Sequence, residues 1–341
     1  MDSKTALSPG DLVLVTGANG YLASHVANEL LSAGYRVRGT VRDVGKNRWL
    51  QDHFDSAYGH NKFELFEVPD MVAVNAFHSA ANGVAAIAHV ASVMSNEADP
   101  NKVIPPVVAG VTNALEAAAS QPSVKSFVYT SSSAAATSPG PGAAGHDVHE
   151  DSWNEGAIER AWSPGADHIV VYYASKAQAE QALWKWVGEW HPRFRVNAVL
   201  PNANFGRVIS SEHQGYPSTA GWIEAIFKGT ATDRLMRAIS PQYFVDVQDT
   251  ARLHVAALTR PDLSSQRLFA FAQPYTTNQI LQTLRKLYPE RQFPEDLSGL
   301  EEDNNKILPA DNAERILKET GRLGWTSLED SLRMNTEELA R

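Results

Sequence analysis

Short apolar runs alternate with helical stretches along the chain as far as Leu200. The runs are too short for helices and almost continuously apolar, which is typical of parallel strands buried on both faces. We expect strands at Leu12–Thr16, Arg36–Thr40, Phe63–Val68, Val84–His89, Ser126–Thr130 and Arg195–Leu200. We expect helices at Leu22–Ala33, Val72–Ala81, Pro106–Ala119 and Tyr173–Trp190. This alternation predicts an α/β fold built on a doubly wound parallel sheet with helices on both faces.

The alternation weakens from Pro201 onward, where the pattern predicts shorter elements and a smaller C-terminal lobe. No linker-like segment separates the two regions, so we expect a single interdigitated unit with a core at about 1–200 and a lobe at about 201–341. Helices are expected at Gly221–Lys228, Asp249–Thr259, Thr276–Leu287 and near the C-terminus, and a strand at Arg267–Phe271.

Composition excludes several classes of protein. The 341 residues are 43% hydrophobic, enough for a substantial core, and the absence of cysteine excludes disulfides, zinc-thiolate sites and thiol nucleophiles. The net charge of -9 argues against a nucleic-acid surface. The polar start, Met1–Gly10, has no signal pattern and no apolar run could span a bilayer, so we expect a cytoplasmic protein that does not bind membranes. It is expected to be a monomer or a homodimer without a bound metal.

A glycine-containing loop lies directly between the first expected strand and the first expected helix. In such a loop, backbone N–H groups can approach a pyrophosphate, and the helix N-terminus attracts its negative charge. Gly17 supplies the tight turn and Gly20 the close approach, while Ala23 stands where a third glycine is usual. A plain glycine-rich turn is the alternative interpretation. The residues expected to contact the dinucleotide here are Gly17, Asn19, Gly20, Tyr21 and Leu22.

The end of the second expected strand indicates which dinucleotide binds. No carboxylate stands at the strand end itself to accept hydrogen bonds from a ribose 2′-hydroxyl. Arg42 and Lys46 are instead suited to a 2′-phosphate, which predicts NADPH. Two alternatives remain: both cations are simply solvated, or Asp43 turns inward and favours NAD.

Tyr172 and Lys176 are four residues apart at the start of an expected helix and therefore share one face. A tyrosine is a poor proton exchanger at neutral pH, and a nearby ammonium favours the phenolate and lowers the tyrosine pKa. Tyr173 is the lower-ranked candidate for this role. A core tyrosine beside a surface lysine is the alternative interpretation of the pair.

Hydroxylated residues run from Thr130 to Ser133 at the end of the fifth expected strand, at the sheet edge where ligands bind. A serine hydroxyl at this place can donate a hydrogen bond to a carbonyl oxygen as it gains negative charge. The alternative is that small hydroxylated residues simply end a strand.

These motifs together resemble the short-chain dehydrogenase/reductase superfamily, extended branch, over nearly the whole chain. The motifs that carry this resemblance are Thr16–Ala23, Thr130–Ser132 and Tyr172–Lys176. Within the superfamily, three further segments resemble the dihydroflavonol-reductase-like group and, more closely, the NADPH-dependent fungal aldehyde and carbonyl reductases. These segments are Val37–Arg42, His89–Ser92 and Val199–Asn202. The resemblance implies a Rossmann fold and a catalytic triad of Ser132, Tyr172 and Lys176, with Ser133 as the alternative register for the serine.

The resemblance also implies further cofactor contacts: Asp70 and Met71 beside the adenine, Val90 and Ala91 along the cofactor, and Pro201, Asn202 and Asn204 near the carboxamide. Thr130, Tyr172 and Lys176 are expected to touch the cofactor as well. Many members of the superfamily carry an asparagine on the helix before the fifth strand. The matching stretch here, Pro106–Gly110, has none, which puts a proton relay through that side chain in doubt.

The expected reaction is hydride transfer from NADPH to a ketone or an aldehyde, with Tyr172 delivering the proton and Ser132 polarising the oxygen. Apolar and aromatic candidates for the pocket favour a small hydrophobic carbonyl compound, and the C-terminal lobe is expected to supply most of the pocket. Each candidate also has core packing as its alternative. The candidates are Val93, Met94, Ser133, Trp162, Phe205, Val208, Trp222, Ile239, Gln242 and Tyr243, with Trp222 and Gln242 preferred.

Two other functions remain open. A nucleotide-sugar epimerase or dehydratase is disfavoured by the missing acid after the second strand and by the apolar pocket. A non-catalytic NADP-sensing module is disfavoured by the presence of Ser132, Tyr172 and Lys176. The polar segment His146–Asp151 lacks the spacing of a metal site, and His89 is expected to hydrogen-bond locally rather than act as a base.

Overall fold

The computed structural model describes residues 6–139, 145–239 and 241–341. The chain divides into two compact units whose segments alternate in the sequence. The first unit comprises Met1–Ser138, Asp151–Leu200 and Ala251–Leu268, and the second comprises Pro139–Glu150, Pro201–Thr250 and Phe269–Arg341. The expectation that the two parts act as one interdigitated unit stays a prediction. Within the ranges described, no helix is both long and apolar enough to cross a membrane.

A seven-stranded sheet runs in the order β10-β7-β5-β4-β1-β2-β3. The pairings from β7 across to β3 are all parallel, so the predicted doubly wound parallel sheet is confirmed. The strand order reverses between β1 and β4, the place where such sheets bind ligands. The strands are β1 Leu12–Val15, β2 Arg36–Val41, β3 Phe63–Glu67, β4 Ala86–His89, β5 Ser126–Thr130, β7 Arg195–Pro201 and β10 Arg267–Ala270.

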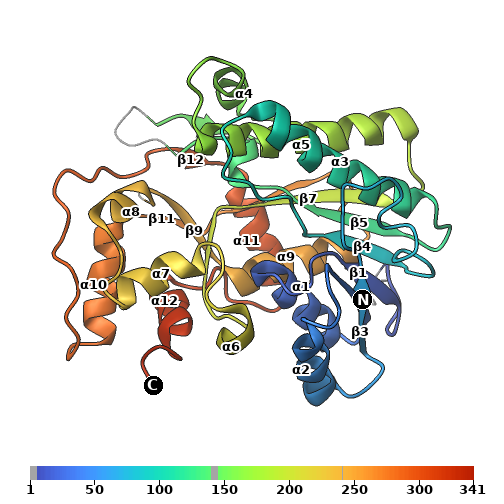
Figure 1. The fold of residues 1–341 in the computed structure, drawn as a ribbon, viewed down its shortest axis with the longest axis horizontal. Helices are drawn as coiled ribbons and strands as arrows, with labels where there is room; N and C mark the ends of the chain where they lie inside the picture. Colours follow the sequence, from blue (N-terminus) through green and yellow to red (C-terminus); the bar gives the residue numbers. More distant parts are fainter. Residues whose placement is uncertain (1–5, 140–144, 240) are drawn as a thin grey trace. The chain divides into compact units, whose positions relative to one another are not determined.

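Helices cover both faces of this sheet, with α3 and α5 on one side and α1 and α9 on the other (Figure 1). Side chains at the end of β5 follow the same division, because successive residues of a strand point to opposite faces. The Thr130 hydroxyl lies 2.7 Å from His254 Nε2 on α9, whereas Ser131 Oγ donates to Glu180 on α5. The helices are α1 Tyr21–Ser32, α2 Arg48–Tyr58, α3 Pro100–Ala119, α4 Glu155–Ala161, α5 His168–Trp190 and α9 Val247–Thr259.

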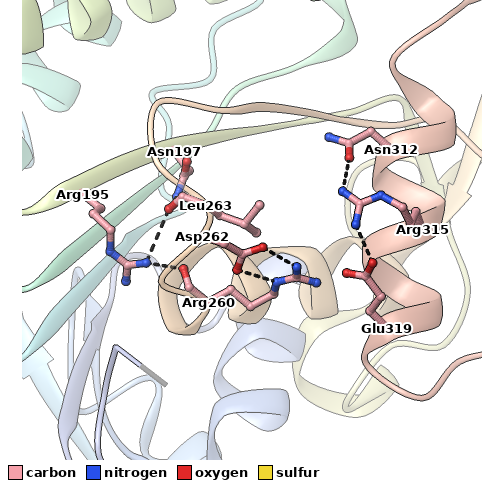
Figure 2. A network of polar contacts seen from close by, with 8 residues as sticks. All are labelled: Arg195, Asn197, Arg260, Asp262, Leu263, Asn312, Arg315 and Glu319. Carbon is pink, nitrogen blue, oxygen red and sulfur yellow. Dashed lines mark hydrogen bonds and ion pairs between the residues drawn. The ribbon is translucent and has the colours of Figure 1, made fainter. Parts of the chain in front are cut away.

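Polar side chains on β7 fix the C-terminal end of α9 (Figure 2). Arg195 donates hydrogen bonds to the carbonyls of Leu258 and Arg260, and Asn197 donates to the Ala257 carbonyl at 2.9 Å. These contacts satisfy carbonyl groups that the last turn of a helix leaves without intrahelical partners. In the second unit, Arg315 bridges Asn312 and Glu319 along a single helix (Figure 2).

One expected helix is absent. The segment Val72–Ala81 forms a series of turns, so this prediction is wrong. Asn75 has a left-handed φ of 62°, which interrupts a right-handed helix, and the Asp70 carboxylate accepts the Val72 N–H in a local turn. The apolar side chains of the segment are buried without a helix: Phe77 packs edge-on against His89 with ring centroids 5.5 Å apart.

The second unit has its own apolar core. Its three-stranded sheet pairs β9 antiparallel with β11 and parallel with β8. The strands are β6 Asp147–Val148, β8 Ala203–Phe205, β9 Gln242–Asp246, β11 Gln273–Tyr275 and β12 Lys306–Ile307. The helices are α6 Ser211–Gln214, α7 Ala220–Phe227, α8 Asp233–Ala238, α10 Thr277–Leu287, α11 Ala310–Glu319 and α12 Leu328–Thr336. Side chains from β8, β9, β11, α7, α8, α10 and α12 form one cluster around Phe205, Phe244 and Tyr275.

Candidate active site

The glycine loop lies where the sequence places it, between β1 and α1. Gly17 has a φ of 66°, and a Cβ atom added there would lie 3.1 Å from the Ala91 side chain. The loop is fixed to β2, since the Gly17 N–H donates to Thr40 Oγ1 at 3.0 Å and the Ala18 N–H to the Thr40 carbonyl at 2.9 Å. The first turn of α1 carries no acidic residue, so the helix N-terminus is electrostatically suited to an anion.

Gly39 on β2 packs against the same loop. A Cβ atom at Gly39 would come within 2.6 Å of the Ala18 side chain and 2.7 Å of the Phe63 ring. Real Cβ atoms do not approach other atoms this closely, so only glycine allows the loop to pack directly on the strand. The sequence analysis did not identify Gly39 as part of this site.

Thr16 joins the ends of β1 and β4, beside the glycine loop. Its hydroxyl accepts the N–H groups of Val90 and Ala91 at 3.0 Å and lies 3.1 Å from His89 Nδ1. Because both lone pairs of this oxygen are used, its own hydrogen donates to Nδ1, which assigns the His89 proton to Nε2. Burial, together with the charge of Lys176, lowers the pKa of His89 to about 3. His89 is therefore a neutral local hydrogen-bonding residue, as predicted.

The expected selector of the 2′-phosphate lies at the end of β2, where Arg42 is exposed. The Lys46 ammonium lies 3.3 Å from the Asp43 carboxylate, which also accepts the Lys46 N–H. These contacts with Lys46 hold the pKa of Asp43 below its usual value. Asp43 is thus engaged by Lys46 in this structure, and Arg42 is exposed.

Asn113 on α3 positions the segment expected beside the adenine. Its amide donates to the Met71 carbonyl at 2.9 Å and to the Ala73 carbonyl at 3.0 Å. Gly110 allows the Met71 side chain to lie against the same helix, since a Cβ there would be 2.7 Å from Met71 Cε. The sequence analysis missed Asn113, which lies three residues beyond the stretch compared with the family. Its amide hydrogens are donated to the backbone.

The two residues expected to manage the proton are on α5, which begins with Asp167 accepting the N–H groups of Ile169 and Val170. Lys176 is buried and donates to Ser92 Oγ at 3.2 Å. Burial lowers the pKa of Lys176 to about 8. Ser92, which sequence reasoning also missed, therefore fixes the ammonium one turn beyond Tyr172.

Tyr172 is half-buried, and its phenol lies beside the Ser132 side chain. Burial raises the pKa of Tyr172, and the contact with Ser132 offsets only part of that rise. The expectation that Lys176 brings this pKa down is wrong for this structure, because loss of solvent outweighs the other influences on the phenol. A raised pKa keeps Tyr172 protonated at neutral pH, so it holds a proton to give.

The three serines after β5 face different partners. Ser132 begins a single 3₁₀ turn, Ser133–Ala135, and accepts the Ala134 N–H. Ser131 donates to Glu180 instead. The contact with Tyr172 supports Ser132 over Ser133 as the serine of the predicted triad.

The substrate candidates fall into both units. In the first unit, Val93 and Ser133 are half-buried, while Met94 and Trp162 are exposed. In the second unit, Phe205 and Ile239 lie in the apolar core, and Phe205 packs edge-on against Tyr275 at 5.2 Å. The structure therefore fits the core-packing alternative for Phe205 and Ile239. Val208 is buried as well, and Tyr243 donates to the Asn305 carbonyl at 2.8 Å.

Trp222 and Gln242, the preferred substrate pair, are both half-buried in the second unit. Trp222 packs against the core cluster, and the Gln242 amide donates to the Ile239 carbonyl at 2.8 Å. The residues expected to contact the carboxamide also lie in the second unit. Pro201 is buried, Asn202 accepts the Ala203 N–H at 2.7 Å, and Asn204 accepts the Thr250 hydroxyl at 2.7 Å.

The chain is similar to known proteins over nearly its whole length. The model of the "NAD dependent epimerase/dehydratase family" matches residues 13–269, so the chain belongs to this family, in the extended branch of the short-chain dehydrogenase/reductases. It is 42% identical to Aldehyde reductase 2 of Sporidiobolus salmonicolor, covering 96% of this chain and 95% of the relative. It is 38% identical to Ketoreductase adrE of Penicillium rubens, covering 95% of each. A crystal structure of Gre2 from Candida albicans in complex with NADPH superposes with a TM-score of 0.82 at 24% identity, covering 97% of this chain and 98% of that one.

Proposed function

We propose that the protein reduces ketones and aldehydes to alcohols with NADPH. The observation that carries this proposal is the arrangement of Ser132, Tyr172 and Lys176: a serine beside a protonated phenol, with a buried ammonium one turn further along the same helix. The names of Aldehyde reductase 2 and Ketoreductase adrE support carbonyl reduction as the reaction.

Each residue of the triad has a distinct task. The Ser132 hydroxyl donates a hydrogen bond to the carbonyl oxygen and stabilises the negative charge that develops there. Tyr172, which is protonated at neutral pH, donates its proton to the same oxygen. Lys176 stays fixed by Ser92 and can donate hydrogen bonds to ribose hydroxyls. When bound, NADPH supplies the hydride that completes the alcohol.

The dinucleotide would be held by the glycine loop, with its pyrophosphate at the N-terminus of α1, where Gly17 and Gly20 leave the backbone open to close approach. Asn19, Tyr21 and Leu22 complete this contact. Arg42 and Lys46 would bind the 2′-phosphate, and Thr130, Val90 and Ala91 would line the cofactor along the sheet edge. Asp70 and Met71 would flank the adenine.

The substrate would be a small hydrophobic carbonyl compound, for which Val93, Met94, Ser133 and Trp162 are the candidate contacts in the first unit. A cytoplasmic location, suggested by the absence of cysteine, and a monomeric or homodimeric state belong to the same proposal.

A spectrophotometric assay tests the reaction. Purified protein is mixed with NADPH or NADH and a panel of aryl ketones, keto esters and aldehydes, and the loss of reduced cofactor is followed. We expect turnover on at least one carbonyl compound and a higher kcat/KM for NADPH. A higher kcat/KM for NADH contradicts the assignment of Arg42 and Lys46, and no turnover despite NADPH binding supports a non-catalytic sensing module.

An epimerase or dehydratase acting on nucleotide sugars is the second candidate, because the matched family carries both activities in its name. Such enzymes are expected to retain their oxidised cofactor between turnovers. Mass spectrometry of the purified protein after denaturation distinguishes the two: stoichiometric NAD would favour the epimerase, and its absence together with NADPH consumption would favour the reductase.

A further inference from the structure

A completely buried carboxylate lies on the same helix as Tyr172 and Lys176. Glu180 has no exposed surface, and both of its oxygens are engaged. Oε2 accepts from Ser131 Oγ at 2.6 Å and from Arg267 Nη2 at 3.2 Å. Oε1 accepts from Arg267 Nε at 2.7 Å and from Trp184 Nε1 at 3.0 Å. The carboxylate is therefore fully bonded and paired with a buried cation.

Arg267 is itself held firmly. Its third donor, Nη1, reaches the Ser152 carbonyl at 2.7 Å, and its guanidinium stacks over the Trp153 ring at 4.0 Å. The side chain is 9% exposed. A planar guanidinium clamped at several points and bound to both carboxylate oxygens fixes the direction as well as the position of Glu180.

Glu180 lies one turn beyond Lys176, which lies one turn beyond Tyr172, so all three are on one face of α5. Its partner Ser131 immediately precedes Ser132. The carboxylate thus connects the helix that carries the proton donor to the strand end that carries the hydrogen-bonding serine. On the opposite face of the sheet, the Thr130–His254 contact holds the residue before Ser131.

We propose that Glu180, held by Arg267, is a positioning residue that sets the distance between the Ser132 and Tyr172 hydroxyls through its bond to Ser131. This inference rests on the proposed carbonyl reduction. Its physical basis is that a buried ion pair adds little net stability compared with an apolar pair of the same size, whereas its directional bonds fix geometry. Reaction rates depend steeply on that geometry, because small misplacements of reacting groups slow catalysis greatly.

Two single substitutions separate positioning from general support of the fold. Ser131→Ala and Trp184→Phe each remove one neutral donor from the Glu180 carboxylate, but only Ser131 connects Glu180 to the strand end. We expect Ser131→Ala to lower kcat about tenfold with KM for NADPH unchanged, since the substrate contacts remain but the two hydroxyls are less well aligned. Trp184→Phe should leave kcat unchanged. Thermal unfolding of both variants, which is expected to show small and similar decreases in Tm, measures their effect on stability.

The double variant Ser131→Ala/Glu180→Gln extends the test. If the two residues act through one bond, the loss in kcat of the double variant is smaller than the product of the two single losses. The proposal is overturned if Ser131→Ala keeps the wild-type kcat, or if Trp184→Phe lowers kcat as much as Ser131→Ala does. If the wild-type protein reduces no carbonyl compound, the proposed function fails and this inference fails with it; if the wild type is active and Ser131→Ala is equally active, only the positioning role fails.

Discussion

The two units of the molecule hold their predicted functional residues in different ways. In the first unit, Thr16, Ser132 and Lys176 are fixed by hydrogen bonds with one to three defined partners each. In the second unit, Phe205 and Trp222 are held by apolar packing against a common cluster. Hydrogen bonds fix single atoms at defined distances, while apolar packing fixes only shape and volume. The residues of the proposed triad are thus held by hydrogen bonds, whereas the candidates of the second unit combine apolar packing with hydrogen bonds of Gln242 and Asn204.

The largest effect is expected in the first unit. Tyr172→Phe should lower kcat by about 10²- to 10⁴-fold while NADPH still binds, because the variant keeps the ring but has no proton to donate. Steady-state kinetics and fluorescence titration with NADPH measure the two properties. Tyr173→Phe is the matched control, since it removes a neighbouring phenol from the same helix and should keep near wild-type turnover. Normal turnover by the Tyr172 variant would remove the proposed proton donor.

In the second unit, the prediction concerns stability. Phe205→Ala removes a fully buried ring that stacks on Phe244 at 5.9 Å, so unfolding should cost about 3–5 kcal/mol less. Denaturation by urea measures this. Trp222→Ala, at a half-buried position, should lose less stability and change the ranking of carbonyl substrates. An equal change of substrate ranking in both variants would show that the two aromatic residues do not have separate roles.

A single methyl group tests whether shape matters in the first unit as well. Gly39→Ala places a Cβ 2.6 Å from the Ala18 side chain, which should displace the glycine loop, weaken NADPH binding and lower stability by about 1–3 kcal/mol. Gly188→Ala on α5 is the control, because its added Cβ meets nothing within 4 Å. Binding by Gly39→Ala at wild-type affinity would contradict the close packing of loop and strand.

The smallest effect concerns charge. Lys176 is a cation below its pKa of about 8 and neutral above it, so affinity for anionic NADPH should fall as the pH rises through that value. His89 contributes no change there, since its pKa is about 3. Lys176→Arg should abolish this dependence because guanidinium keeps its charge. Titrations across pH measure the affinity, and an unchanged profile in the variant would assign the ionisation to another group.

Much of the fold follows from the sequence because its signals are local. The strand predicted at Ser126–Thr130 is confirmed residue for residue, and the first helix within one residue at each end. The helix α2 was missed, although Leu50 and Phe54 are buried four residues apart on one face. The turns near Asn75 were also missed, because a left-handed residue has no clear signal when apolar spacing imitates a helix.

The residues of the site could be predicted where their spacing in the sequence reveals them, but properties that depend on solvent exposure could not. Tyr172 and Lys176 were found as a pair four residues apart, but the rise in the tyrosine pKa comes from burial, which the spacing does not contain. Ser92 and Asn113 act through contacts far away in the chain. Glu180 could have been found, because it continues the four-residue spacing of Tyr172 and Lys176.

Three consecutive residues, Thr130, Ser131 and Ser132, reach three separate partners: His254, Glu180 and Tyr172. Thr130 and Ser131 reach opposite faces of the sheet, because neighbouring side chains on extended backbone alternate in direction. Inserting or deleting one residue here would exchange these two assignments at once, whereas a substitution would alter only one contact.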